Sequence, residues 1–89
     1  MRSDNICVYI LECCDGTLYT GWTNDIEKRL KAHNAGTASK YTRSRTPVKL
    51  LYAESLETRE QALSREAQIK KLKKIDKLAL IKEAGSDRP

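Results

Sequence analysis

The sequence contains no phenylalanine, so its aromatic side chains are one tryptophan and four tyrosines. The apolar run "ICVYIL" near the N-terminus is too short for a signal peptide, and no later segment is long and apolar enough to span a membrane. The three cysteines, two of which are adjacent, fit neither a disulfide framework nor a zinc-binding spacing. These absences exclude secreted, disulfide-rich and membrane-spanning proteins, and they predict a protein of the reducing cytoplasm.

Length and charge restrict the remaining classes. A chain of 89 residues has room for one domain with a small core, and we expect it to be monomeric. Lysine and arginine number 17 against 12 aspartates and glutamates, which gives a formal charge of +5. A surface of this sign suits a polyanionic partner such as nucleic acid.

The stretch 7–22 predicts a β-hairpin around an Asp-Gly turn. A two-residue turn (15–16) and a three-residue loop (14–16) both fit the turn chemistry. The two registers differ by one residue, which moves every side chain of one strand to the opposite face. Only the three-residue loop places Tyr9 and Tyr19 on the same face, with Gly21 opposite Tyr9.

The segment that follows the hairpin predicts a helix with clear ends. Asn24 is a suitable N-cap, and Glu27 stands three residues later in a capping-box arrangement. Gly36 is a typical C-terminal stop. Ile26 and Leu30 are one turn apart, so we expect both to face the core.

The rest of the chain alternates polar and apolar segments. Residues 37–47 predict a polar, basic loop, and residues 48–55 predict a third strand. A long helix is expected over 58–74 with a capping box at its start, and a short last helix over 76–84, begun by an aspartate and ended by a glycine. The predicted fold is therefore α+β, in the order ββαβαα, with a small three-stranded antiparallel sheet flanked by helices.

Glu66 is a candidate for chemistry because of its place on the long helix. It shares the expected inward face with Ala62, Leu63 and Ile69. Burying an unpaired carboxylate is costly, so Glu66 is either paired with a nearby lysine or arginine, or a metal ligand. One carboxylate is enough for a magnesium site that water and phosphate oxygens complete.

Arg29 and His33 lie four residues apart and share one helix face. Arg29 is either a surface charge or a planar donor for phosphate oxygens, and His33 is either a helix-end residue or a member of a polar site. Tyr9 and Tyr19 are either core residues or, beside a cation, phenols of which one acts as a general base.

The basic loop is a candidate for phosphate binding. Ser39 and Thr42 add hydroxyl groups that can donate to phosphate oxygens, although a charged loop is more often merely solvated. The predicted nucleic-acid contacts are Lys40, Tyr41, Arg43 and Arg45.

Taken in order, these residues resemble the GIY-YIG nuclease family. The first family tripeptide matches "CVY", which ends at Tyr9, and the second matches "YTG" at 19–21. The helix segment "RLKAH" supplies the arginine and the histidine, and Glu66 stands where the family has a metal-binding glutamate. The resemblance runs from about 6 to 81 in a single domain, and is closest to the small, stand-alone bacterial members of the UPF0213 type, which share the "SKYTR" stretch.

The resemblance implies an endonuclease that hydrolyses DNA phosphodiester bonds with one divalent ion, magnesium or manganese. In such an enzyme Tyr9 is the general base, while Tyr19 and His33 orient the attacking water and the Tyr9 phenolate. Arg29 stabilises the charged phosphate, and Glu66 holds the metal.

The chain carries no DNA-recognition domain, which implies little sequence specificity and fits a role in DNA repair or recombination. It also lacks the asparagine that many family members carry in the helix after the glutamate. The alternatives are a non-catalytic nucleic-acid-binding module that keeps the fold, and a protein-interaction domain.

Overall fold

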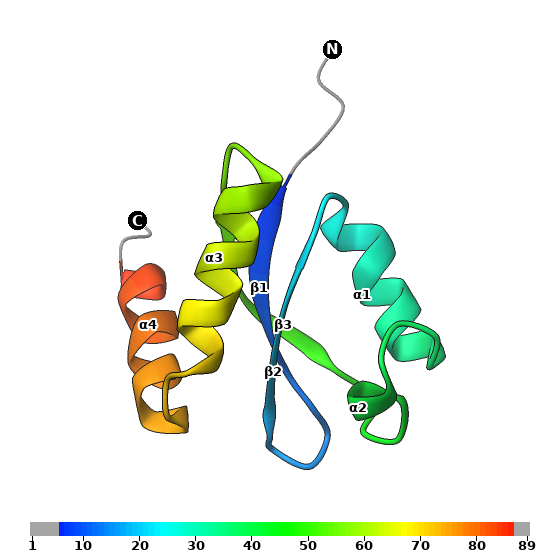
Figure 1. Cartoon of the computed structure of the whole chain (residues 1–89). Coiled ribbons are helices and arrows are strands. Elements are labelled where there is room, and N and C mark those ends of the chain that lie inside the picture. The colour runs from blue at the N-terminus through cyan, green and yellow to red at the C-terminus, as the bar shows by residue number, and fades with distance from the viewer. Residues whose placement is uncertain (1–5, 87–89) are drawn as a thin grey trace.

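The computed structural model describes residues 6–86, in which three strands and four helices follow one another in the order ββααβαα (Figure 1). The strands form one antiparallel sheet in the order β2-β1-β3, so the first strand lies in the centre. The elements are β1 (Cys7–Glu12), β2 (Leu18–Thr23), α1 (Ile26–Ala35), α2 (Lys40–Arg43), β3 (Lys49–Ser55), α3 (Arg59–Lys70) and α4 (Lys74–Ser86). This architecture confirms the predicted α+β class and the three-stranded sheet.

The β1–β2 hairpin has the three-residue loop. Tyr9 pairs with Gly21 and Leu11 pairs with Tyr19. Gly16 occupies the left-handed region with φ +85°, where a glycine avoids the steric cost that a side chain would bring. The register therefore places Tyr9 and Tyr19 on one face, as the three-residue alternative predicted.

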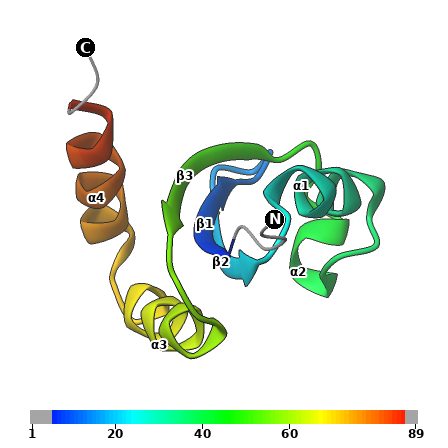
Figure 2. The same cartoon turned by 90° about the horizontal axis from the view of Figure 1, so that it is seen from above.

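Strand β1 is buried on both faces, and its side chains belong alternately to two separate hydrophobic cores. Val8 and Ile10 pack with Ala62 and Ile69 beneath α3. Tyr9 and Leu11, on the opposite face, pack with Ile26 and Leu30 of α1. Seen from above, the sheet is a middle layer with α3 and α4 on one side and α1 and α2 on the other (Figure 2).

Two local predictions in the first half of the chain were wrong. The N-cap of α1 is Asp25 rather than Asn24, because the Asp25 carboxylate accepts a hydrogen bond from the backbone amide of Lys28. The expected loop contains the short helix α2. The hydroxyl of its N-cap Ser39 accepts a hydrogen bond from the backbone amide of Tyr41. Gly36 ends α1 with φ +82°, as predicted.

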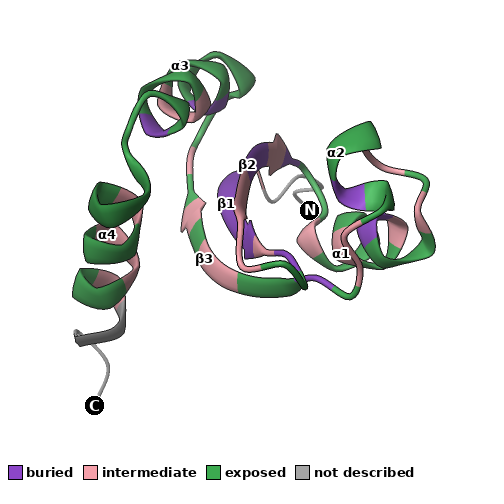
Figure 3. Cartoon of the chain, turned by 90° about the horizontal axis from the view of Figure 1, so that it is seen from below, coloured by how far each residue is buried: buried purple, intermediate pink, exposed green. Residues whose placement is uncertain are grey.

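The C-terminal helices also differ from expectation. The long helix ends at Lys70 rather than 74, and α4 starts at Lys74 and extends to Ser86. At the start of α3 the backbone amide of Gln61 donates a hydrogen bond to Thr58 Oγ1. The Gln61 side-chain oxygen accepts a hydrogen bond from the backbone amide of Glu57, not from that of Thr58, so no capping box forms. Most of α4 is exposed (Figure 3). Within residues 6–86 none of the helices has the length and apolarity needed to cross a bilayer.

Candidate active site

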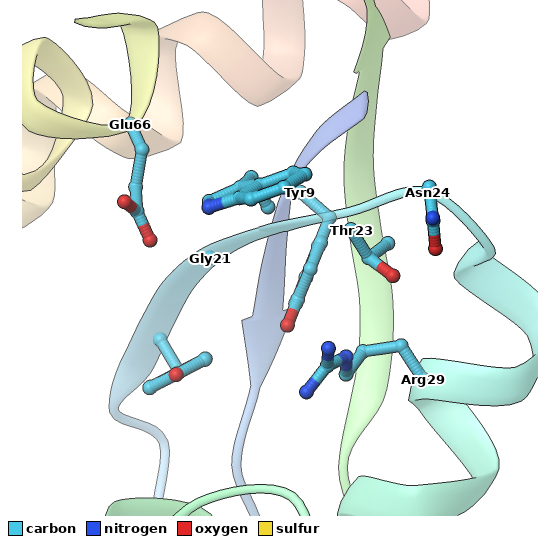
Figure 4. A pocket seen from close by; sticks show the side chains of 8 residues that line it. Tyr9, Gly21, Thr23, Asn24, Arg29 and Glu66 are labelled. Carbon is cyan, nitrogen blue, oxygen red and sulfur yellow. The ribbon is translucent and has the colours of Figure 1, made fainter. Parts of the chain in front are cut away.

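A pocket of about 390 Å³ opens at the edge strand β2, and residues from helices on both sides of the sheet line it. Glu66 enters it from α3 and Arg29 enters from α1, with Tyr9 and Gly21 between them (Figure 4). The residues that line the pocket are Tyr9, Tyr19, Gly21, Trp22, Thr23, Asn24, Arg29 and Glu66. Four of the five residues singled out in the sequence as a catalytic set thus line one cavity, although α1 and α3 lie on opposite sides of the sheet.

Gly21 gives the Tyr9 ring its space. A Cβ added at Gly21 would lie 2.7 Å from the Tyr9 hydroxyl oxygen, 2.9 Å from Tyr9 Cζ and 3.2 Å from Tyr19 Cε2. The Tyr9 ring therefore lies directly over the Gly21 backbone, and its centroid is 6.4 Å from that of Tyr19. The hairpin register predicted this arrangement, since it sets Gly21 opposite Tyr9.

His33 does not line the pocket but lies directly behind Tyr9. Its Nε2 is 2.9 Å from the Tyr9 hydroxyl, and its Nδ1 is 2.8 Å from Thr42 Oγ1. The Tyr19 ring contacts His33 edge-on at a centroid distance of 5.1 Å. His33 and Thr42 are 1% and 0% exposed, so this end of the hydrogen-bonded chain is shielded from water, while Tyr9 lines the pocket.

Burial controls the protonation of this chain. It raises the pKa of Tyr9 well above the usual range, with a further increase from Tyr19, while the Arg29 charge opposes the increase. Burial also lowers the pKa of His33 below its ordinary value, and Arg29 lowers it further. At neutral pH Tyr9 is therefore a protonated phenol, hydrogen bonded to a neutral imidazole.

Glu66 is partly buried on α3, less so than Ala62 and Ile69 on the same helix face. Ala62 and Ile69 are fully buried as expected, but Leu63 is 46% exposed, so the prediction that it faces inward was wrong. The Glu66 side chain is 18% exposed and lies 3.4 Å from the half-exposed ammonium group of Lys70. The salt-bridge partner considered from the sequence thus exists, while the carboxylate remains accessible from the pocket.

The donor set suits only a weak, open metal site. The described residues contain no group of three or more histidine, cysteine, aspartate or glutamate side chains that could hold a metal ion. Among residues 6–86, Glu66 is the only carboxylate that lines the pocket. Magnesium accepts one protein carboxylate when water and substrate phosphate supply the other ligands, so the pocket fits such an ion and does not fit a closed four-ligand site.

The predicted phosphate-binding residues lie on or next to α2, which reaches the pocket through Tyr41. Tyr41 stacks on Tyr19 with a centroid distance of 6.0 Å, and the Arg45 guanidinium lies 4.0 Å from the centroid of the Tyr41 ring. Arg45 also forms an ion pair with Asp15 at 3.1 Å and donates to the Tyr41 carbonyl. Arg45 thus fastens α2 to the hairpin turn, and its contact with phosphate stays a prediction.

Lys40 and Arg43 are exposed on the same short helix. The structure therefore leaves these two basic side chains accessible to a phosphate backbone. Thr42, expected to donate to phosphates, is fully buried, so that expectation was wrong.

Some site residues were missed in the sequence. Trp22, Thr23 and Asn24 line the pocket because they continue β2 directly beyond Gly21. Thr42 lies in the "SKYTR" stretch, but its contact with His33 depends on the helical turn of α2.

Comparisons with known proteins match most of the chain. The family model described as the GIY-YIG catalytic domain matches residues 5–78. A UPF0213 protein of Clostridium perfringens is 61% identical over 74 residues, which are 83% of this chain and 80% of that protein. A UPF0213 protein of Syntrophus aciditrophicus is 58% identical, over 85% of this chain and 88% of that protein.

Two solution NMR structures share the fold. A UPF0213 protein from Bacillus halodurans is 41% identical, with a TM-score of 0.57, over 88% of this chain and 83% of that one. A protein from E. faecalis is 37% identical, with a TM-score of 0.66, over 99% of this chain and 94% of that one.

Proposed function

The chain belongs to the GIY-YIG family, a nuclease family, and from that premise we propose that it is a metal-dependent endonuclease that hydrolyses DNA phosphodiester bonds. The observation that carries the proposal is the single pocket that unites a hydrogen-bonded phenol, a guanidinium group and an accessible carboxylate. A protein that only binds nucleic acid has no need to bring Glu66 and Arg29 to the two sides of Tyr9.

Tyr9 and His33 move the proton of the attacking water. Tyr9 is protonated at rest, so it accepts the water proton on its hydroxyl oxygen only as its own proton passes to His33 Nε2, 2.9 Å away. The oxygen of the water then bonds to phosphorus, the bond from phosphorus to the 3′ oxygen breaks, and solvent protonates the leaving oxygen. His33 returns its proton through Tyr9 to water after product leaves.

Arg29 and Glu66 deal with charge. The Arg29 guanidinium offers planar donors to the non-bridging phosphate oxygens as negative charge develops on them. Glu66 would hold a magnesium or manganese ion, which when bound neutralises phosphate charge. The positive charge of Lys70 beside Glu66 partly offsets the negative charge of the carboxylate. This proximity is consistent with weak binding of the metal ion.

The substrate follows from size and charge. Lys40 and Arg43 are exposed on α2, whose Tyr41 stacks on the pocket residue Tyr19, and they suit the sugar-phosphate backbone, which carries no sequence information. We therefore propose cleavage with little sequence specificity, in DNA repair or recombination.

A plasmid-nicking assay tests the proposal. Native protein with magnesium or manganese should convert supercoiled plasmid to the nicked form, and Glu66→Ala and Tyr9→Phe should not. Both variants should still bind DNA, because neither removes a cation from α2. Binding by native protein without nicking under any divalent ion would support the alternative, a nucleic-acid-binding module.

A further inference from the structure

The contact between His33 and Thr42 links the site to the buried side of α2. Thr42 is fully buried, so it does not reach substrate, yet its hydroxyl oxygen lies 2.8 Å from His33 Nδ1. The N-cap Ser39 starts the helical turn that carries Thr42 inward, while Lys40 and Arg43 on the same turn face solvent. The turn thus joins the exposed basic surface to the hydrogen-bonded chain behind Tyr9.

The partners of Thr42 define the direction of the hydrogen bonds. A threonine hydroxyl has one proton, and the Ser39 carbonyl, which can only accept, lies 3.5 Å from Thr42 Oγ1. If that carbonyl takes the Thr42 proton, Thr42 Oγ1 accepts the proton of His33 Nδ1. A neutral imidazole carries one N–H, so Nε2 is then the acceptor for the Tyr9 hydroxyl.

We propose that Thr42 is a positioning residue that holds His33 in the Nδ1–H tautomer, leaving Nε2 free to accept the Tyr9 proton. The catalytic part of this inference rests on the proposed nuclease function. In the opposite tautomer Nε2 donates to Tyr9, so His33 cannot take the phenol proton and the transfer from water stops.

A hydroxyl group suits this role better than a carboxylate would. The polar or charged groups that face His33 are Tyr9, Tyr19, Thr42 and Arg29. A carboxylate at position 42 would favour the imidazolium, which has no free lone pair for the Tyr9 proton. Thr42 fixes the ring without adding charge.

The tautomer can be measured directly, because His33 is the only histidine of the chain. Tag-free protein with ¹⁵N-labelled histidine gives one pair of imidazole nitrogen signals in a long-range NMR correlation spectrum, and their shifts identify the protonated nitrogen. The native protein and Thr42→Ser should show Nδ1–H. Thr42→Val, which keeps the shape and removes the hydroxyl, should show Nε2–H.

The two variants also separate positioning from packing. If Thr42 only fills space, valine should be tolerated better than serine, whereas positioning predicts the reverse order. In plasmid nicking, Thr42→Val should lower kcat by roughly 10²-fold with KM for DNA changed less than about twofold, and Thr42→Ser should stay near native. Thermal melts identify a valine variant that does not fold, and the native spectrum then decides alone.

Two results would overturn the inference: a native spectrum with Nε2–H, or a serine variant that loses more activity than the valine variant. The proposed function fails separately. A native protein that shows Nδ1–H and a Thr42→Val variant that changes tautomer, with no nicking by either, would refute the nuclease and leave the tautomer assignment in place.

Discussion

Replacing Gly21 by alanine is the sharpest structural test of the site. The new Cβ would lie 2.7 Å from the Tyr9 hydroxyl oxygen and 2.9 Å from Cζ, both shorter than a van der Waals contact. Tyr9 is 2% exposed, so its ring has little room to move away. Moving it also breaks the 2.9 Å hydrogen bond to His33.

The cost of Gly21→Ala combines three effects. Overpacking a filled core costs about 1–3 kcal/mol. Separating two buried hydrogen-bonding groups costs about 1–3 kcal/mol. Alanine restricts the unfolded chain more than glycine, which offsets about 0.4–1 kcal/mol. We expect a net loss of about 2–4 kcal/mol in the free energy of unfolding, and at least about 8 °C in melting temperature for a domain of this size.

Gly16→Ala is the matched control. A Cβ at Gly16 meets no atom within 4 Å, but the residue has φ +85°, so alanine there costs about 1–2 kcal/mol of backbone strain. Urea titration should show both variants destabilised. Only Gly21→Ala should shift the His33 nitrogen signals and abolish nicking. A Gly21→Ala protein within about 0.5 kcal/mol of native, with unchanged His33 signals, would refute the close packing of Tyr9 on Gly21.

Three further predictions address charge. Glu66→Gln should abolish metal-dependent nicking but change stability by less than about 0.5 kcal/mol in a urea titration, because its pair with half-exposed Lys70 is weak; a larger loss would indicate a structural salt bridge. Replacing Lys40 and Arg43 by alanine should lower the slope of log affinity against log salt by about 2, equally for unrelated DNA sequences, in fluorescence titrations; an unchanged slope would exclude phosphate contacts at α2. Burial lowers the pKa of His33 below 6.5, so the folded state favours the neutral ring. The stability that His33 contributes is therefore fully present above pH 6.5 and decreases as the pH drops below that value. Thermal melts from pH 7.5 to 5 should show this fall in the native protein and a smaller one in His33→Gln.

The hairpin could be predicted from local chemistry, but the choice between its two registers could not, because Gly16 can take a positive φ in either turn. Only the three-residue loop, which the structure shows, places Tyr9 and Tyr19 on one face with Gly21 opposite Tyr9. Arg29 and His33 follow from helical spacing, since α1 starts within a residue or two of the expected position. The shift of its cap from Asn24 to Asp25 reflects two adjacent residues of nearly equal capping preference.

The remaining features depend on tertiary packing, which a local pattern does not reveal. Helix α2 is only four residues long, and a basic stretch of that length reads as a loop unless Ser39 is taken as its cap. Leu63 lies about 100° around α3 from Ala62, and the face that packs on the core, centred on Ala62 and Ile69, is too narrow to include it. Arg45 was expected to face phosphate, but no sequence rule indicated Asp15, thirty residues away, as its partner.

The site lies at the edge of the sheet because its residues belong to two different cores. Tyr9 packs in the core under α1, while Glu66 comes from the helix that covers the opposite core. In the middle of a sheet, side chains on the two faces cannot meet, because the backbone of the strands lies between them. Beyond β2 there is no further strand among the described residues, so Glu66 reaches past the sheet edge towards Arg29. Gly21 has no side chain to block this passage, and the Tyr9 hydroxyl comes within reach of both layers. In the proposed nuclease, a substrate phosphate bound between Arg29 and an ion held by Glu66 would therefore lie across β2, beside Tyr9.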